Sequence, residues 1–123
     1  MNLVDSCGWV EYLADSPRAD VYAPAVEDRA SLLVPTICIL EVYKHALKQR
    51  DEDAALEAVA AMRQGRVVEL DLGLAMSAAE LGIETGLPLA DSIILATARA
   101  HDATIWTQDA HFRAVEGVRY TPV

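Results

Sequence analysis

Short apolar runs alternate with longer segments in which apolar residues recur at helical spacing. Runs of three or four apolar residues bounded by turn-forming or acidic residues predict strands, and the amphipathic segments predict helices. The predicted strands cover residues 2–4, 31–34, 67–70, 104–107 and 118–120. The predicted helices cover residues 6–14, 17–28, 36–49, 54–64, 71–84 and 90–100, followed by a helical turn at 110–114.

The order of these elements predicts the fold class. Strands that are separated by helices favour parallel pairing through right-handed crossovers. We therefore expect an α/β protein, a three-layer α/β/α sandwich with a mostly parallel sheet of about five strands. Neither a repeat nor a linker interrupts the pattern, so we expect a single domain that spans residues 1–123.

Composition supports a folded domain and raises a question about charge. Apolar residues make up 53% of the chain, which is too many for a disordered protein. The formal net charge is -9, and on its own it argues against a nucleic-acid partner, because phosphate binding normally requires a basic surface. A nucleic-acid function would need bound divalent cations, a local basic patch or a basic protein partner.

The cysteines and the N-terminal residues indicate where in the cell the protein is expected. Cys7 and Cys38 are far apart and form no CxxC pattern, so they do not predict a metal site and are expected in the core. The N-terminal residues include neither a basic region nor a long apolar run, so we expect no secretory signal and no membrane association. A cytoplasmic protein with reduced thiols is the simplest account.

Four acidic residues stand in apolar surroundings, unlike the acids of the polar stretch 51–57, which are expected on solvated surfaces and at helix caps. They are Asp5, Glu41, Asp91 and Asp109. Asp5 and Asp109 follow predicted strands, Asp91 lies in the first turn of a predicted helix, and Glu41 lies in the second turn of another. In parallel sheets the loops at the carboxyl ends of the strands converge, so all four can reach one crevice.

Two interpretations of these acids remain open from their spacing. A cluster of carboxylates repels itself without a cation, and oxygen ligands select Mg²⁺ or Mn²⁺ over Zn²⁺. Such a metal site can activate water and bind a phosphodiester. Alternatively, the acids are separate helix caps, since Asp5 and Asp91 both lie at helix starts, where anions are favoured.

Four stretches in the order of a known family favour the metal site. The chain resembles the PIN domain, and most closely the VapC-type toxins of toxin–antitoxin modules. The stretches that carry the resemblance are Val4-Asp5-Ser6, the segment at Glu41-Val42, Leu89-Ala90-Asp91-Ser92-Ile93-Ile94-Leu95-Ala96-Thr97-Ala98, and Thr107-Gln108-Asp109-Ala110-His111-Phe112. They span nearly the whole chain, and the last two are the more specific.

The resemblance implies an endoribonuclease that uses Mg²⁺ or Mn²⁺ and leaves a 5′-phosphate and a 3′-hydroxyl. It implies that Asp5 and Asp109 bind the metal directly, and that Asp91 is a further ligand or holds water in the metal's coordination shell. Glu41 falls on the position that orients or deprotonates the attacking water. Thr107 falls on a Ser/Thr position whose hydroxyl supports the site.

The resemblance also implies partners. A VapC-type toxin acts on RNA, is silenced by a small VapB-like antitoxin, and reaches operator DNA only through that antitoxin. We also expect a homodimer, formed through apolar residues of the early helices or of the helix at 71–84, because a small acidic domain has more apolar content than its core can hide. Trp9 and Tyr12 are expected in the core or at an interface, and both fit a protein–protein surface.

Three further functions compete with this interpretation. A receiver domain of a response regulator also binds Mg²⁺ through acids, but it requires adjacent acids after the first strand and a Lys late in the chain; here Ser6 follows Asp5, and no Lys follows Lys48. The second is a PIN-fold nuclease of RNA processing, and the third is a non-catalytic PIN-fold binding module.

The histidines are expected at the surface. His45, His101 and His111 all lie in predicted helices or helical turns beside charged residues. His111 differs from the other two because it is two residues from Asp109.

Overall fold

Five parallel strands form one sheet in the order β3-β2-β1-β4-β5, in a computed structural model that describes residues 1–123. The strands are β1 (Asn2–Val4), β2 (Leu32–Pro35), β3 (Arg66–Val68), β4 (Thr104–Thr107) and β5 (Val118–Tyr120). The predicted parallel sheet of about five strands is confirmed.

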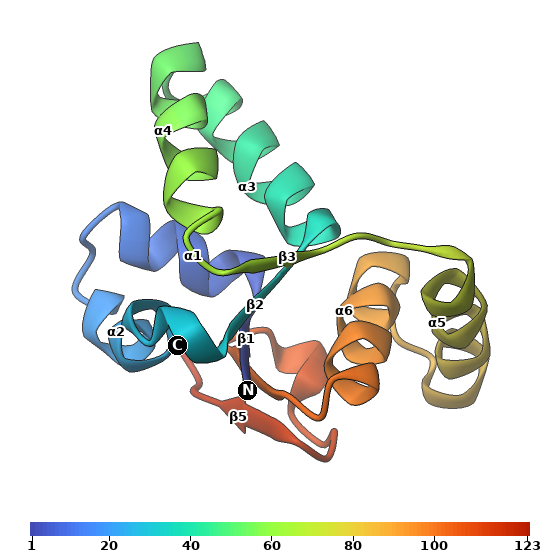
Figure 1. Ribbon diagram of the computed structural model, residues 1–123. Coiled ribbons are helices and arrows are strands. Elements are labelled where there is room, and N and C mark those ends of the chain that lie inside the picture. The colour runs from blue at the N-terminus through green and yellow to red at the C-terminus, as the bar shows by residue number, and fades with distance from the viewer.

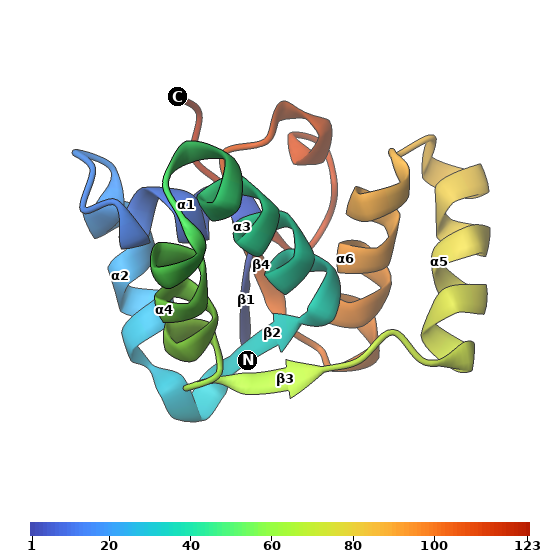
Figure 2. The ribbon, with the colours of Figure 1, turned by 90° about the horizontal axis from the view of Figure 1, so that it is seen from above.

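Helices lie on both sides of this sheet, as predicted for a three-layer sandwich. They are α1 (Ser6–Leu13), α2 (Ala19–Glu27), α3 (Thr36–Gln49), α4 (Glu52–Met62), α5 (Leu72–Thr85) and α6 (Leu89–Ala100), with short 3-10 turns η1 (Arg29–Ser31) and η2 (Ala110–Phe112). In Figures 1 and 2, α5 and α6 lie on one side of the strands and α1 and α2 on the other. The α3–α4 hairpin packs beside α1 and projects away from the sheet (Figure 1).

The third strand differs from its predicted range of 67–70. It begins at Arg66 and ends at Val68, because its register pairs Val68 with Pro35, the last residue of β2. β3 is an edge strand and has no other neighbour. Beyond Val68 the chain therefore has no strand to pair with and leaves the sheet.

Side-chain caps and one glycine define several helix ends. Asp5 caps α1: its carboxylate accepts a hydrogen bond from the Ser6 backbone N–H. Asp51 and Asp71 cap α4 and α5 in the same manner. Gly86 ends α5 in the left-handed conformation, with φ of 72°, which a residue without a Cβ adopts without strain.

The core lies between the sheet and the helices and contains Trp9. This side chain is 0% exposed, so of the two places expected for it, the core and a protein–protein surface, it occupies the core. Gly8 lets the Tyr22 ring pack closely against α1, because a Cβ at Gly8 would lie 2.6 Å from that ring. Tyr12 is partly exposed, and its hydroxyl donates to Glu27. Cys38 is buried in the core as expected, and Cys7 is partly buried.

The strand order fixes where a crevice can form. From β1 the chain proceeds through β2 to β3 on one side of the sheet, and then returns to place β4 and β5 on the other. The order therefore reverses between β1 and β4, and binding sites of open α/β sheets form at the carboxyl ends of the strands at such a point.

No individual helix has the length and apolar composition needed to cross a membrane. Helices α5 and α6 meet those criteria only as a pair, and the chain bends by 115° between them.

Candidate active site

The carboxyl ends of β1 and β4 bring the predicted acids together. Asp5 directly follows β1, and Asp109 lies two residues after β4. Asp91 lies in the first turn of α6, and Glu41 in the second turn of α3. Charge repulsion from Asp5 and Asp109 acts on both Glu41 and Asp91, so the four carboxylates share one site.

Asp5 is the most enclosed of the four, with 3% of its surface exposed. Its Oδ1 accepts from the Ser6 N–H at 2.8 Å, and its Oδ2 accepts from the Thr107 hydroxyl at 2.7 Å. The Cys7 thiol lies 3.6 Å from the same Oδ2. These contacts fix both carboxylate oxygens, although burial still raises the pKa of Asp5.

Thr107 links Asp5 to Asp109. Its fully buried hydroxyl donates to Asp5 and accepts from the Asp109 backbone N–H at 2.9 Å. A hydroxyl is suited to this position because it can donate and accept at once. Thr107 therefore sets the relative positions of the two acids.

Gln108 holds the loop between these residues from its other side. Its Oε1 accepts from Arg18 Nε at 2.7 Å and from the Tyr22 hydroxyl at 3.1 Å. Its Nε2 donates to Glu11 at 3.2 Å. The loop that carries Asp109 is thus anchored to α1 and α2.

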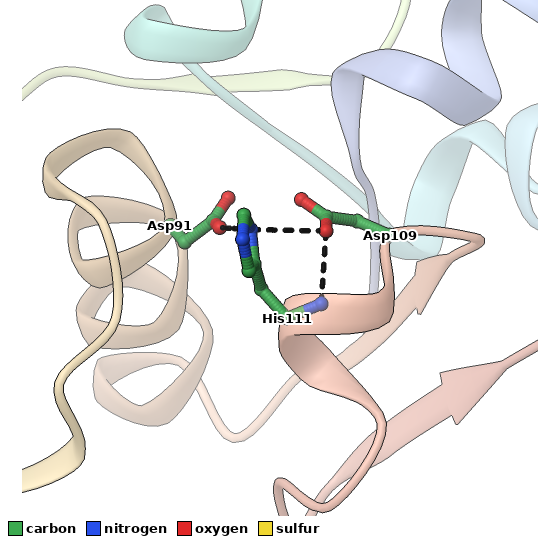
Figure 3. Close-up of side chains that lie close together, drawn as sticks. All are labelled: Asp91, Asp109 and His111. Carbon is green, nitrogen blue, oxygen red and sulfur yellow. Dashed lines mark hydrogen bonds and ion pairs between the residues drawn. The ribbon is translucent and has the colours of Figure 1, made fainter.

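His111 joins Asp91 to Asp109. Figure 3 shows its ring between the two carboxylates, with Nδ1 3.0 Å from Asp91 Oδ2 and 3.1 Å from Asp109 Oδ1. Its backbone N–H also donates to Asp109 Oδ1 at 2.9 Å. His111 is at the surface, as expected, with 59% of its side chain exposed, but it is also part of the site, which the sequence did not predict.

The electrostatics of the site are those of an acidic cluster without Lys or Arg. Burial raises the pKa of Asp91 to about 6, repulsion from Asp109 and Asp5 adds to the rise, and His111 opposes it. Burial also raises the pKa of Glu41, assisted by Asp5 and Asp109. Among Lys, Arg and His side chains, only His111 forms an ion pair with these carboxylates.

The donor set fits a divalent metal ion. Ligand atoms of Asp91, Asp109 and His111 all lie within 4.8 Å of one another, and Asp5 adds a buried carboxylate beside them. Oxygen-rich sites of this kind suit Mg²⁺ and Mn²⁺. A bound dication would offset the repulsion that raises the carboxylate pKa values.

Comparisons with known proteins agree with this architecture. The PIN domain family model matches residues 3–118. A search of curated proteins returned no significant match.

Solved structures share the fold over nearly the full length. A toxin–antitoxin complex from Klebsiella pneumoniae superposes with a TM-score of 0.83 at 24% identity, covering 100% of both chains. VapC20 of Mycobacterium tuberculosis, a toxin that cleaves the sarcin–ricin loop, gives 0.78 at 17% identity, covering 100% of this chain and 98% of that one.

VapBC2 of Rickettsia felis, bound to a DNA fragment from its promoter, gives a TM-score of 0.75 at 12% identity, covering 98% of this chain and 97% of that one. At these identities the likeness to solved structures establishes the fold. The family match covers β2, β3, β4, α6 and all four acidic positions. The chain belongs to the PIN domain family.

Proposed function

We propose that this chain is an endoribonuclease that requires a divalent metal ion, Mg²⁺ or Mn²⁺. The observation that carries the proposal is the convergence of four carboxylates, two of them buried, at the strand-order reversal of a PIN fold. An acidic cluster with no Lys or Arg partner is costly unless a cation completes it. VapC20, which has this fold, is a toxin that cleaves RNA.

Asp5, Asp91 and Asp109 would hold the metal. The ion supplies charge that stabilises the phosphodiester as it becomes more negative, and it lowers the pKa of water. Thr107 holds Asp5 and Asp109 in fixed relative positions, because its hydroxyl forms hydrogen bonds to both residues. The carboxylate of Asp5 needs no rearrangement for this task, because hydrogen bonds already fix its position.

Glu41 is the group that would orient and deprotonate the attacking water. It is half-buried, and burial together with the neighbouring carboxylates raises its pKa, which makes it a better proton acceptor than a solvated Glu. The water oxygen forms a bond to phosphorus while the bond from phosphorus to the 3′-oxygen breaks. The products are a 5′-phosphate and a 3′-hydroxyl, the latter formed when the leaving oxygen takes up a proton.

Metal binding and Asp91→Asn should both relieve the repulsion in the site. Mn²⁺ at 100 times its Kd should raise the free energy of unfolding by about 2.7 kcal/mol. Without metal, Asp91→Asn should raise the free energy of unfolding at pH 7 by about 1 kcal/mol, because it removes a repelled charge whose repulsion solvent partly screens. The same variant should lose most of the Mn²⁺ response. Thermal unfolding with EDTA or Mn²⁺ measures all three effects.

The pH dependence provides an independent check. The Asp91 pKa rises from 3.8 to about 6 in the folded protein. As the pH falls, the folded state therefore binds this proton at a higher pH than the unfolded state does. Stability of the metal-free wild type should therefore increase from about pH 6 toward pH 4, and this part of the gain should be absent in Asp91→Asn. A wild type that is indifferent to Mn²⁺ at pH 7 would count against the metal site.

The finer proposal is that the chain is the toxin of a toxin–antitoxin pair. The structural likeness to toxin–antitoxin proteins supports it. The chain also has a surface suited to a small apolar partner: a groove of about 520 Å³ between α1, α3 and α4. Its apolar lining includes Val10, Leu13, Val42 and Ala46.

This groove replaces the surface expected over Trp9 and Tyr12, because Trp9 is buried. Leu13 lies on α1, the helix that begins at Asp5, so the groove and the acidic site share one element. An apolar antitoxin segment in the groove could place an Arg against the carboxylates, where a guanidinium makes bidentate contacts. We propose that the antitoxin inhibits by filling the groove and displacing the metal, and that operator DNA is bound only through it.

A homodimer is the third part of the proposal. Leu72, Met76 and Ile83 lie on one face of α5 and are 77%, 59% and 88% exposed. A second copy can cover this stripe with the same stripe about a two-fold axis. Wild type should therefore sediment as a dimer at micromolar concentration and Ile83→Glu as a monomer. Leu56→Glu, on exposed α4, is the control, and a monomeric wild type would remove the proposal.

A further inference from the structure

His111 lies where a metal ligand would lie. Its Nδ1 is 3.0 Å from Asp91 Oδ2 and 3.1 Å from Asp109 Oδ1, as Figure 3 shows. Neighbouring ligands of an octahedral ion with bonds near 2.1 Å are spaced about 3 Å apart. The nitrogen therefore already has the spacing from each carboxylate oxygen that coordination of one ion by all three groups would require.

The local backbone fixes this position. Asp109 caps η2, and its Oδ1 accepts the backbone N–H of His111 at 2.9 Å. The turn thus directs the imidazole toward α6, where Asp91 lies in the first turn. A single Nδ1 can donate only one proton, yet it faces two carboxylates at nearly equal distance. A metal ion resolves this, since the nitrogen and both oxygens can all donate electron pairs to it.

We propose that His111 Nδ1 is a metal ligand beside Asp91 and Asp109, and that this nitrogen makes the site selective for Mn²⁺ over Mg²⁺. The inference rests on the proposed metal-dependent function. Mg²⁺ favours oxygen ligands and keeps several waters, whereas Mn²⁺ is a transition-metal ion and accepts an imidazole nitrogen more readily than Mg²⁺ does. When Nδ1 binds the ion, the ring proton resides on Nε2, and the ring is 59% exposed, so that proton can reach solvent.

Pulsed electron paramagnetic resonance of the purified protein loaded with Mn²⁺ tests the ligand directly. A histidine nitrogen bound to Mn²⁺ gives a nitrogen coupling that a carboxylate site lacks. The coupling is expected in wild type and in His45→Gln, whose side chain is exposed on α3, and it should be lost in His111→Gln.

Calorimetric titration with each metal tests selectivity. His111→Gln should weaken Mn²⁺ binding about tenfold while changing Mg²⁺ binding less than about twofold. Circular dichroism should show an unchanged fold, because the side chain is largely exposed.

The outcomes separate the inference from the function on which it rests. Mn²⁺ binding to wild type without a nitrogen coupling would overturn the role of His111 and leave the carboxylate site intact. Unchanged selectivity in His111→Gln would overturn the inference in the same way. Wild type that binds neither metal would overturn both.

Discussion

Asp5→Asn is expected to reduce the rate of RNA cleavage roughly 1000-fold, the largest effect of any single change in the site. Asp5 is 3% exposed, and Ser6 and Thr107 fix its two carboxylate oxygens. Asparagine keeps the shape and still caps α1, but it removes the charge and replaces one metal-binding oxygen with an amide NH₂ group. Initial rates on a labelled RNA, at saturating Mn²⁺, measure the loss.

Asp51→Asn is the matched control for this experiment. Asp51 also caps a helix, α4, by accepting a hydrogen bond from the Ala54 N–H. Asparagine caps helices about as well as aspartate, so this variant should retain both fold and activity. If Asp5→Asn cleaved RNA at the rate of Asp51→Asn, Asp5 would have no place in the mechanism.

Expression of the chain alone is expected to reduce colony counts by orders of magnitude, and co-expression of the neighbouring small open reading frame should restore growth. The partner would fill the α1–α3–α4 groove and place a basic side chain in the acidic site. While it is bound, neither the metal ion nor RNA can occupy that site, so the fraction of active toxin falls as the partner accumulates. Co-purification of the two proteins and colony counts measure the effect.

Variants of the groove distinguish this mechanism from a general loss of toxicity. Leu13 lines the groove and is 37% exposed, so Leu13→Glu should prevent rescue while leaving cleavage by the chain alone intact. Leu56→Glu places the same charge on α4, outside the groove lining, and should still be rescued. Equal growth with and without the small protein, and no complex, would contradict the antitoxin proposal and leave the nuclease proposal standing.

The fold was largely predictable because local patterns and turn chemistry agree with it. Apolar runs ended by acids predicted β1 and β4, and Gly86 and Pro88 lie between α5 and α6, where one predicted helix ends and the next begins. The end of β3 was not predictable from its own residues. Glu69 and Leu70 continue the pattern of a strand, but the neighbouring strand β2 ends at Pro35, so they have no partner.

The proximity of the acids followed from topology, but the contacts that orient them did not. Parallel strands bring their carboxyl ends to one edge, which was sufficient to place Asp5 near Asp109. Only the resemblance singled out Thr107. Its hydrogen bonds to both acids depend on side-chain directions that periodicity does not specify.

The places of two ring-bearing side chains could be predicted only in part. Trp9 was expected in the core or at a protein–protein surface, and His111 was expected at the surface. Trp9 is fully buried in the core, and η2 turns the His111 ring toward Asp91, which is 20 residues away. The available signal for His111 was its spacing of two residues from Asp109.

Mapping of new RNA ends tests the central claim most directly. Purified wild type and Asp5→Asn are incubated with total RNA in Mn²⁺ or EDTA, and the 5′ and 3′ ends are sequenced. Wild type in Mn²⁺ should generate discrete new ends that carry a 5′-phosphate and a 3′-hydroxyl, and these ends should be absent in EDTA and with Asp5→Asn. The same ends in EDTA or with Asp5→Asn, or no new ends with wild type, would contradict a ribonuclease built on these carboxylates.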